Sequence, residues 1–315
     1  MTDPVVRGDR GSVPAAGPVA VLVNPRAGRR RAGDLRAAVT AALGSSGRPI
    51  RLLDTADRAS AERACHAAVA GGAAALIAVG GDGTVHLALQ AVAGRPVALG
   101  IVPTGTGNDI ATELGLPTEP ITAARAAGAA LALSRTRAID LALVETARGG
   151  TPRWFAGVLA AGFDARVNHL ANRMVLPRGP RRYDLAVLAE LALLRRLPYR
   201  VRIDDVESRL DAVLVCVGNT AAYGGGMRIC PGADPADGLL DVLVGARVGR
   251  TTLIRLKRQV RAGTHVRHPQ VRQARGVRVE LDCPGITAYA DGEPVSPLPI
   301  TVTCVPEALT LLDPR

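Results

Sequence analysis

The spacing of apolar positions changes about halfway along the chain. In the first half, short apolar runs that predict strands alternate with Ala-rich stretches of helical spacing. In chain order these predicted elements are 19–23, 34–43, 50–53, 60–70, 75–79, 85–93 and 97–102. Strands that alternate with helices predict a parallel sheet covered by helices.

From about Ile139 the strand-like runs follow one another directly. They are 141–145, 154–160, 199–203, 211–217, 239–246, 277–281, 286–290 and 300–304. Two stretches of helical spacing, 183–197 and 250–262, interrupt them. We therefore expect an α/β N-terminal domain with a parallel sheet (18–138) and a mainly antiparallel, β-sandwich-like C-terminal domain (139–305).

Composition narrows the classes of partner. The chain has 315 residues, enough for two domains, and 48% hydrophobic residues, enough for a sizeable core. Its net charge of +11 indicates either an anionic partner or simply an Arg-rich solvated surface. Aromatic residues make up only 2%, so stacking platforms for nucleic acid are scarce, and nucleic acid is the less favoured partner.

The cysteines and the hydropathy pattern bear on the compartment. The five cysteines include no C-x-x-C pair, which argues against a zinc site or a disulfide framework and favours a reducing compartment. Residues 1–17 contain no apolar leader core, and no run of 18 apolar residues predicts a membrane span.

The strongest chemical signal is the loop Gly80-Gly81-Asp82-Gly83-Thr84. It follows a buried strand and precedes a helical pattern, so its backbone N–H groups and the helix N-terminus predict a phosphate cradle. The alternative is a Gly-rich turn in which the aspartate only caps the helix.

Two further loops follow predicted strands in the same way. Pro103–Asp109 comes one strand later, and Asn24–Gly28 follows the first strand. Ligands of open α/β sheets bind at the carboxyl ends of the strands, where all three loops would lie. Asp109 could instead simply cap the helix predicted at 110–114.

The motifs N-P-x-x-G, G-G-D-G-T and P-x-G-T-x-N-D, in this order, resemble the catalytic domain of diacylglycerol kinases, which bacterial soluble lipid kinases, sphingosine kinases and ceramide kinases share. The resemblance covers about residues 18–313 and continues through downstream motifs, which begin at Gly218, Tyr223, Pro231, Asp237 and Asp291. G-G-D-G-T alone would also fit NAD kinases.

The resemblance assigns roles by matching position. It implies ATP binding by Asn24, Pro25, Arg26, Ala27, Gly28, Thr55, Gly80, Gly81, Asp82, Gly83, Thr84, Val85, His86 and Thr106. Asp82, Asp109 and Asp140 match an acidic network that organises catalytic Mg²⁺. It also implies that residues 306–315 return to the first domain.

Further roles are implied for the second domain. Asp237 matches a structural Mg²⁺ ligand, completed by the backbone carbonyls of Asp234 and Leu239, and oxygen-only ligands suit a hard cation. Glu293 matches the general base, although Asp291 could share or take that role, and Asp291-Gly292 could also be an ordinary hairpin turn. Gly157 departs from the pattern, because many relatives carry Asn there.

The expected function is an ATP- and Mg²⁺-dependent lipid kinase that converts diacylglycerol to phosphatidic acid. It would be cytoplasmic and peripheral to the inner face of the membrane, and a homodimer is left open. The basic helix at 250–262 can lie on anionic lipid or pack on the core. An NAD kinase-like enzyme and a non-catalytic lipid- or nucleotide-binding protein are the alternatives.

Overall fold

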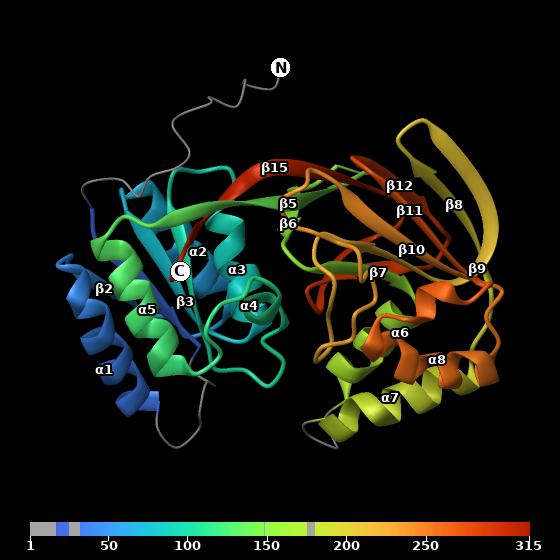
Figure 1. Cartoon of the computed structure of the whole chain (residues 1–315), viewed down its shortest axis with the longest axis horizontal. Coiled ribbons are helices and arrows are strands. Elements are labelled where there is room, and N and C mark those ends of the chain that lie inside the picture. The colour runs from blue at the N-terminus through green and yellow to red at the C-terminus, as the bar shows by residue number, and fades with distance from the viewer. Residues whose placement is uncertain (1–16, 25–31, 148, 175–179) are drawn as a thin grey trace. The chain divides into compact units, whose positions relative to one another are not determined.

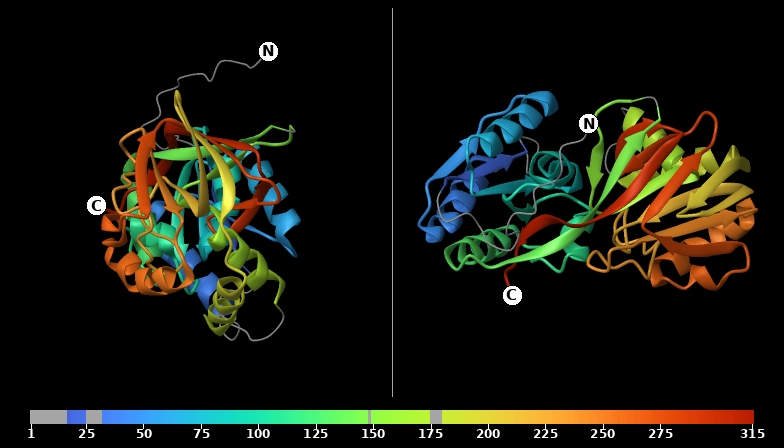
Figure 2. Two further views of the ribbon diagram at one scale, coloured as in Figure 1. Left: turned by 90° about the vertical axis from the view of Figure 1, so that its right-hand side faces the viewer. Right: turned by 90° about the horizontal axis from the view of Figure 1, so that it is seen from above.

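The computed structural model describes residues 17–24, 32–147, 149–174 and 180–315, and their contacts divide into two compact units (Figure 1). Unit 1 comprises the described residues up to Leu141 together with Val305–Arg315, and unit 2 comprises Ala142–Cys304. Strands β5 (Thr136–Thr146) and β15 (Ile300–Leu312) belong partly to each unit and pair with each other (Figure 2).

Unit 1 is built on a parallel sheet. Its strands, in spatial order, are β2 (Ile50–Leu53), β1 (Val19–Val23), β3 (Ala75–Gly80) and β4 (Ala98–Pro103). The end of β15 extends this sheet, because Leu311 pairs in parallel with Leu99 of β4. Strands β3 and β4 are buried throughout, as expected for central strands of a parallel sheet with both faces covered.

Helices cover both faces of this sheet (Figure 1). They are α1 (Ala32–Leu43), α2 (Arg58–Ala70), α3 (Asp82–Val92), α4 (Asp109–Glu113) and α5 (Pro120–Ala132), with a short 3-10 turn η1 (Gly44–Ser46) after α1. α1 and α5 bury Val39, Leu43 and Leu131 against alternate residues of the strands. α2 and α3 pack together on the opposite face.

Unit 2 is mainly antiparallel. The order of its strands is β14-β13-β7-β9-β8-β12-β15, while β10 pairs with β9 and β11, and β6 pairs with β5. The strands are β6 (Arg153–Phe155), β7 (Val158–Gly162), β8 (Leu197–Ile203), β9 (Val206–Gly218), β10 (Leu240–Ala246), β11 (Val271–Gly276), β12 (Arg278–Asp282), β13 (Thr287–Ala290) and β14 (Glu293–Pro297). The helices are α6 (Phe163–Arg173), α7 (Pro180–Ala192), α8 (Arg250–Ala262) and the 3-10 turn η2 (His265–Arg267).

Two apolar clusters stabilise unit 2. One fills the space between the strands and includes Phe155, Tyr199 and Leu240. The other lies between the sheet and the helices and includes Phe163 of α6 and Leu256 of α8. None of the described helices is long and apolar enough to span a membrane.

The fold class expected from the sequence is confirmed, but several elements differ. The single strand expected at 154–160 is two strands, β6 and β7, which are interrupted at Ala156 and Gly157. The helix expected at 183–197 ends at Ala192, because Leu197 already begins β8. The pattern also missed α5, α6 and β11, which alternate weakly or are strongly polar.

Candidate active site

Glycines allow β3 to turn directly into α3. Gly80 ends the strand, and Gly81 is the N-cap of the helix. The Thr84 side chain packs against Gly80 so closely that a Cβ at residue 80 would lie 2.1 Å from Thr84 Oγ1. Any side chain at residue 80 would displace the first turn of α3, whose N-terminus carries a partial positive charge suited to phosphate.

The loop after β4 contacts the loop after β3. Gly80 pairs with Pro103 across the parallel strands, and the Thr104 N–H donates to the Gly80 carbonyl at 2.9 Å. Beyond this bond, a Cβ on Gly105 would lie 2.7 Å from Gly81 Cα, so the two main chains meet through their glycines. The sequence motifs are therefore adjacent in space.

Asn108 closes the second loop. Its Oδ1 accepts the Gly105 N–H at 2.9 Å, and its Nδ2 donates to the Gly105 carbonyl at 3.0 Å. Asn108 itself has a φ of 55°, a left-handed conformation that asparagine tolerates better than most residues. Both bonds hold the loop in one shape.

Carboxylates from the two loops face the same glycine. Asp82 Oδ1 accepts the backbone N–H of Ile110 at 3.1 Å, which ties the start of α3 to α4. A Cβ placed on Gly107 would lie 3.1 Å from Asp82 Oδ2 and 3.6 Å from Asp109 Oδ2. The structure thus directs Asp82 and Asp109 at one position, where two like charges favour a cation.

Asn24 connects the first strand to this cluster. Its backbone N–H donates to the Val79 carbonyl at 3.0 Å, and its Nδ2 donates to Thr84 Oγ1 at 3.2 Å. The rest of the third loop, Pro25, Arg26, Ala27 and Gly28, lies outside the described residues.

The other residues assigned to the nucleotide lie in different settings. Thr55 follows β2 and is half-buried, Gly83 lies in the first turn of α3, and Thr106 is exposed in the loop between β4 and α4. Val85 and His86 are buried within α3, where the His86 carbonyl accepts a hydrogen bond from Gln90 at 2.9 Å.

Asp140 has a main-chain partner on β15. It is buried in β5, and its Oδ1 accepts the Glu307 N–H at 2.8 Å. Glu307 has a φ of 54°, so the bond holds an unusual conformation in β15. Asp140 therefore links β5 and β15.

In unit 2, Asp291 and Gly292 form the two-residue turn between β13 and β14. Their φ values of 52° and 81° are typical of a type I′ hairpin, the turn that the sequence left open. The Asp291 carboxylate accepts the Gly157 N–H at 2.9 Å and the Ala156 N–H at 3.2 Å. The turn is thereby fastened to the break between β6 and β7.

Glu293 begins β14 beside helix α6. Glu293 is half-buried. Burial of Tyr289 raises the pKa of its hydroxyl, and the negative charge of Glu293 raises that pKa further. The Tyr289 hydroxyl lies 2.9 Å from His169 Nδ1, and Asn172 donates to the Gly292 carbonyl at 3.4 Å. Helix α6 therefore supports the hairpin that carries Glu293.

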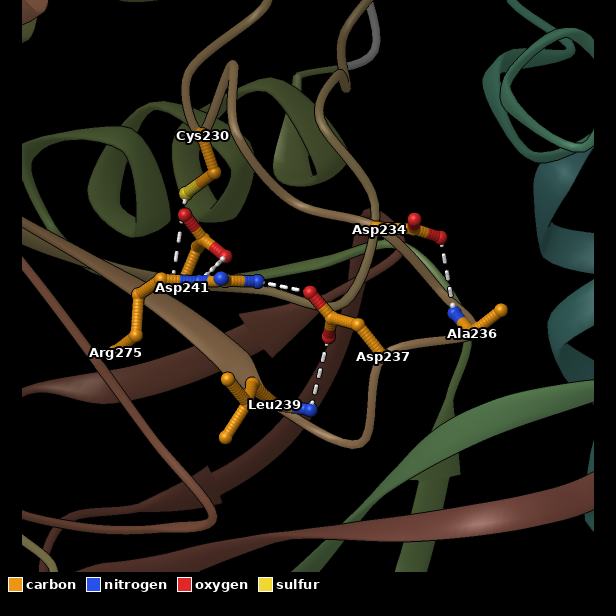
Figure 3. Close-up of polar contacts among 7 residues, drawn as sticks. All are labelled: Cys230, Asp234, Ala236, Asp237, Leu239, Asp241 and Arg275. Atoms are coloured by element: carbon orange, nitrogen blue, oxygen red, sulfur yellow. Dashed lines mark hydrogen bonds and ion pairs between the residues drawn. The ribbon is translucent and has the colours of Figure 1, made fainter.

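The loop before β10 contains the residues assigned to a structural metal (Figure 3). The Asp237 N–H donates to the Asp234 carbonyl at 3.4 Å, and Asp237 Oδ1 accepts the Leu239 N–H at 3.0 Å. Arg275 of β11, directly opposite Asp241 of β10, donates from Nε to Asp241 Oδ2 at 2.9 Å. Its Nη2 bonds the Asp237 carboxylate, so one guanidinium joins two acids.

Known proteins share both halves of this arrangement. Residues 18–144 match the diacylglycerol kinase catalytic domain, and residues 157–313 match the YegS C-terminal NAD kinase beta sandwich-like domain. A diacylglycerol kinase of Mycobacterium tuberculosis (strain CDC 1551 / Oshkosh) is 42% identical over 95% of this chain and 96% of its own length. The chain belongs to the diacylglycerol-kinase-like lipid kinase family.

A second relative supports the family, and two solved structures share the fold of the kinase. A YegS-like lipid kinase of Stenotrophomonas maltophilia (strain K279a) is 31% identical over 78% of this chain and 81% of its own length. A proposed diacylglycerol kinase from Bacillus anthracis str. Sterne has the same fold, with a TM-score of 0.75 over 94% of each chain at 22% identity. An NAD kinase from Archaeoglobus fulgidus in complex with ATP is more distant, with a TM-score of 0.54 and 15% identity over 94% of each chain.

The donor groups of the kinase suit a hard cation in two places. At Gly107, the Asp82 and Asp109 oxygens converge, and such oxygens are the ligands that Mg²⁺ prefers. In the β10 loop, the Asp237 carboxylate and the carbonyls of Asp234 and Leu239 are also oxygen donors, but Arg275 would compete with a metal for Asp237. Within the described part of the chain, no group of three or more His, Cys, Asp or Glu side chains is placed to hold a metal.

Gly157, which departs from the family pattern, is explained by packing in the kinase. A Cβ at this position would lie 2.7 Å from Asp291 Oδ1. The Gly157 carbonyl also accepts the Asn219 N–H at 2.9 Å, and Asn219 Nδ2 donates to the Ala156 carbonyl at 2.9 Å. Glycine therefore leaves room for the Asp291 carboxylate to bond the main chain, and the Gly218-Asn219-Thr220 motif holds the same segment.

Sequence reasoning missed one carboxylate of the kinase. Asp164, in the first turn of α6, accepts hydrogen bonds from Tyr223 and from the Cys216 thiol, at 3.6 Å for the thiol. Burial raises the pKa of Asp164 although both hydrogen bonds lower it. An aspartate just after Gly162-Phe163 is typical of the first turn of a helix. Its partners come from β9 and a distant loop, so no local sequence pattern could predict its buried position.

Proposed function

We propose that the kinase transfers the γ-phosphoryl group of ATP to a lipid hydroxyl, with diacylglycerol as acceptor and phosphatidic acid as product. The observation that carries the proposal is the contact between the two glycine loops, with Asp82 and Asp109 both facing Gly107. This arrangement joins a phosphate cradle to two carboxylates at the carboxyl ends of parallel strands, where α/β sheets bind nucleotides.

The main chain of unit 1 would hold the nucleotide. Asn24, Thr84 and the glycines at 80, 81 and 105 lie in one cluster, so N–H groups and hydroxyls rather than a lysine would contact the phosphates. Mg²⁺ bound with ATP neutralises phosphate charge during transfer. Asp82 and Asp109 are the groups of this chain that would orient it, while Asp140 keeps β5 and β15 in register.

Glu293 would take the proton of the acceptor hydroxyl. The acceptor oxygen forms a bond to the γ-phosphorus as the bond from that phosphorus to the β–γ bridging oxygen breaks, and ADP leaves with the released electron pair. Both carboxylate oxygens of Asp291 already accept backbone N–H groups, so Asp291 fixes the turn and Glu293 is the better candidate for the base.

The proposal assigns a role to each domain. Residues 18–138, with the tail 306–315, would bind ATP, and residues 139–305 would bind the lipid. The reaction consumes ATP, which is supplied in the cytoplasm, and its acceptor resides in a bilayer. We therefore place the enzyme at the inner face of the membrane, where it would contribute to phospholipid biosynthesis.

A transfer assay with labelled ATP tests the reaction. Purified enzyme is given diacylglycerol, ceramide, sphingosine or NAD, with and without Mg²⁺, and the products are identified by mass. We expect Mg²⁺-dependent phosphatidic acid. Labelled NADP would favour the NAD kinase alternative, and nucleotide binding without any labelled product would favour a non-catalytic binding protein.

A further inference from the structure

We propose that the outer faces of α7 and α8 form one docking surface for a bilayer of anionic phospholipids. The surface, called here the helical face, consists of Leu185, Leu188 and Leu193 with Ile254, Arg255 and Arg258. It lies within unit 2 and includes none of the residues assigned above to ATP, metal or catalysis.

Helix α7 is apolar on its inner and its outer side. Inward, Ala186 is fully buried, and Val187 and Leu191 pack on the cluster beneath the sheet. Outward, Leu185 is 46% exposed, Leu188 is 63% exposed, and Leu193, just past the helix end, is 62% exposed. Residues three to four apart share one side of a helix, so Leu185 and Leu188 form an exposed apolar row. Grouped exposed leucines are unusual on a surface that meets only water.

Helix α8 adds positive charge around one exposed isoleucine. Leu256 is buried against the core, which confirms that this helix packs inward, while Ile254 is 58% exposed. The helix carries Arg250, Arg255, Lys257, Arg258 and Arg261 and no acidic residue. Because Arg258 is four residues from Ile254, an apolar anchor and a cation lie side by side on its outer face.

Hydrogen bonds join the end of α7 to the start of α8. The Arg250 guanidinium donates from Nε to the Leu191 carbonyl at 2.9 Å and from Nη2 to the Ala192 carbonyl at 2.8 Å. These carbonyls belong to the last turn of α7, and Arg250 begins α8. Ile254 is one turn from Arg250, so it lies one turn along α8 from the point where the two helices are bonded.

The chemistry of this face favours an anionic bilayer. Leucine and isoleucine side chains gain by leaving water for the acyl boundary, and arginines gain from lipid phosphates. A protein partner or a second copy of this chain would need acidic groups opposite Arg255 and Arg258, and α8 offers none for self-association. The inference rests on the proposed function only in that a lipid acceptor resides in a bilayer.

Vesicle binding without nucleotide tests the helical face separately from turnover. Full-length protein is sedimented with phosphatidylglycerol vesicles and with phosphatidylcholine vesicles. We expect binding to the anionic vesicles that weakens as salt rises, because the Debye length is about 10 Å at 0.1 M. The triple variant L188S/L193S/I254S should bind on the order of tenfold more weakly. The double variant R255Q/R258Q should lose about 30-fold.

Matched variants control for general effects. V206S removes another exposed apolar side chain of unit 2, and R63Q/R125Q removes two exposed charges from helices of unit 1. Both should bind vesicles like wild type, and all four variants should keep the wild-type melting temperature. Unchanged binding by both helical-face variants, or equal losses in the controls, overturns the proposal. Loss of a wild-type dimer by the helical-face variants, with vesicle binding retained, identifies the surface as a subunit interface instead.

Discussion

Two pairs of aspartates in this kinase are held in opposite ways. Asp82 and Asp109 face Gly107 in unit 1, and Asp82 accepts the neutral backbone N–H of Ile110. Asp237 and Asp241 in unit 2 share the guanidinium of Arg275. The first pair converges on a small main-chain position, whereas an arginine of the chain bridges the second pair.

We expect one pair of aspartates to serve the reaction and the other to stabilise the fold. Two carboxylates that converge on a loop glycine are suited to an external cation, so removal of either charge should affect turnover more than folding. A pair with an internal arginine contributes to the folded state, so breaking it should affect folding more than turnover. Substitutions at the two sites should therefore show opposite patterns.

The largest effect is expected for Asp82→Asn. The amide oxygen can still accept the Ile110 N–H, so the fold should keep its melting temperature. Loss of one preorganised electrostatic group typically costs about 10²–10³-fold in kcat, and loss of a charge at a metal should cost at least the upper figure. Steady-state transfer and thermal melting measure the two parts. A wild-type kcat would show that Asp82 has no catalytic role. A large fall in melting temperature would show that Asp82 and Asp109 stabilise the fold instead.

Glu293→Gln extends the comparison to the β13–β14 hairpin. Removal of a general base lowers kcat by roughly 10²–10⁴-fold, and ATP affinity measured separately should change little. Asp291→Asn should instead lower stability, because an amide nitrogen would replace one of the two acceptors for Ala156 and Gly157. A rate that survives in Glu293→Gln but is lost in folded Asp291→Asn would make Asp291 the base.

Arg275→Gln tests the second pair, Asp237 and Asp241, which this arginine bridges. Two charge-assisted hydrogen bonds are lost, but the arginine side chain is 43% exposed, so screening reduces the expected loss to about 1 kcal/mol. The melting temperature should fall by about 3 °C with kcat nearly unchanged. Arg278→Gln, which removes a more exposed arginine paired with Glu280 at 3.4 Å, is the matched control and should change less.

The same variant tests the proposed metal at Asp237. In ATP-free buffer, Mg²⁺ should raise the melting temperature of Arg275→Gln more than that of wild type, because the guanidinium no longer competes for the carboxylate. Adding Asp237→Ala should abolish that gain. Equal increases in all three proteins would rule out a cation at Asp237.

The sequence predicted the first pair better than the second for a physical reason. Glycines and aspartates that follow buried strands show their role locally, so the loops at Gly80 and Pro103 could be placed at one edge of a sheet. The Arg275–Asp241 pair depends on the register of β10 with β11, and β11 is a polar strand, VRQARG, without an apolar run. No local pattern could show that pairing.

The hydrogen bonds that individual side chains make could not be predicted from the sequence either. The motif around Asp291 predicted a turn, but not that its carboxylate bonds the main chain at Ala156 and Gly157, more than 130 residues earlier. Helix α5 was missed because seven of its 13 residues are alanine, which gives little contrast between buried and exposed faces. Contacts distant in sequence, and elements of uniform hydropathy, require the folded structure.

The smallest effect is expected at Asp164, whose hydrogen-bond partners are neutral side chains, Tyr223 and Cys216. Burial raises its pKa, so the folded chain binds this proton more tightly than the unfolded chain does. Stability from this group is therefore highest below the unfolded pKa, near 3.8, and decreases as pH rises through the folded pKa. Each pH unit between the two values lowers the free energy of unfolding by about 1.4 kcal/mol. Asp164→Asn cannot ionise, so it should be more stable than wild type at neutral pH, with the two proteins converging in acid. Denaturant unfolding from pH 3 to pH 8 measures the difference. A variant that is less stable at neutral pH would show that the carboxylate is stabilised by its partners, which would place Asp164 with Asp237 and Asp241.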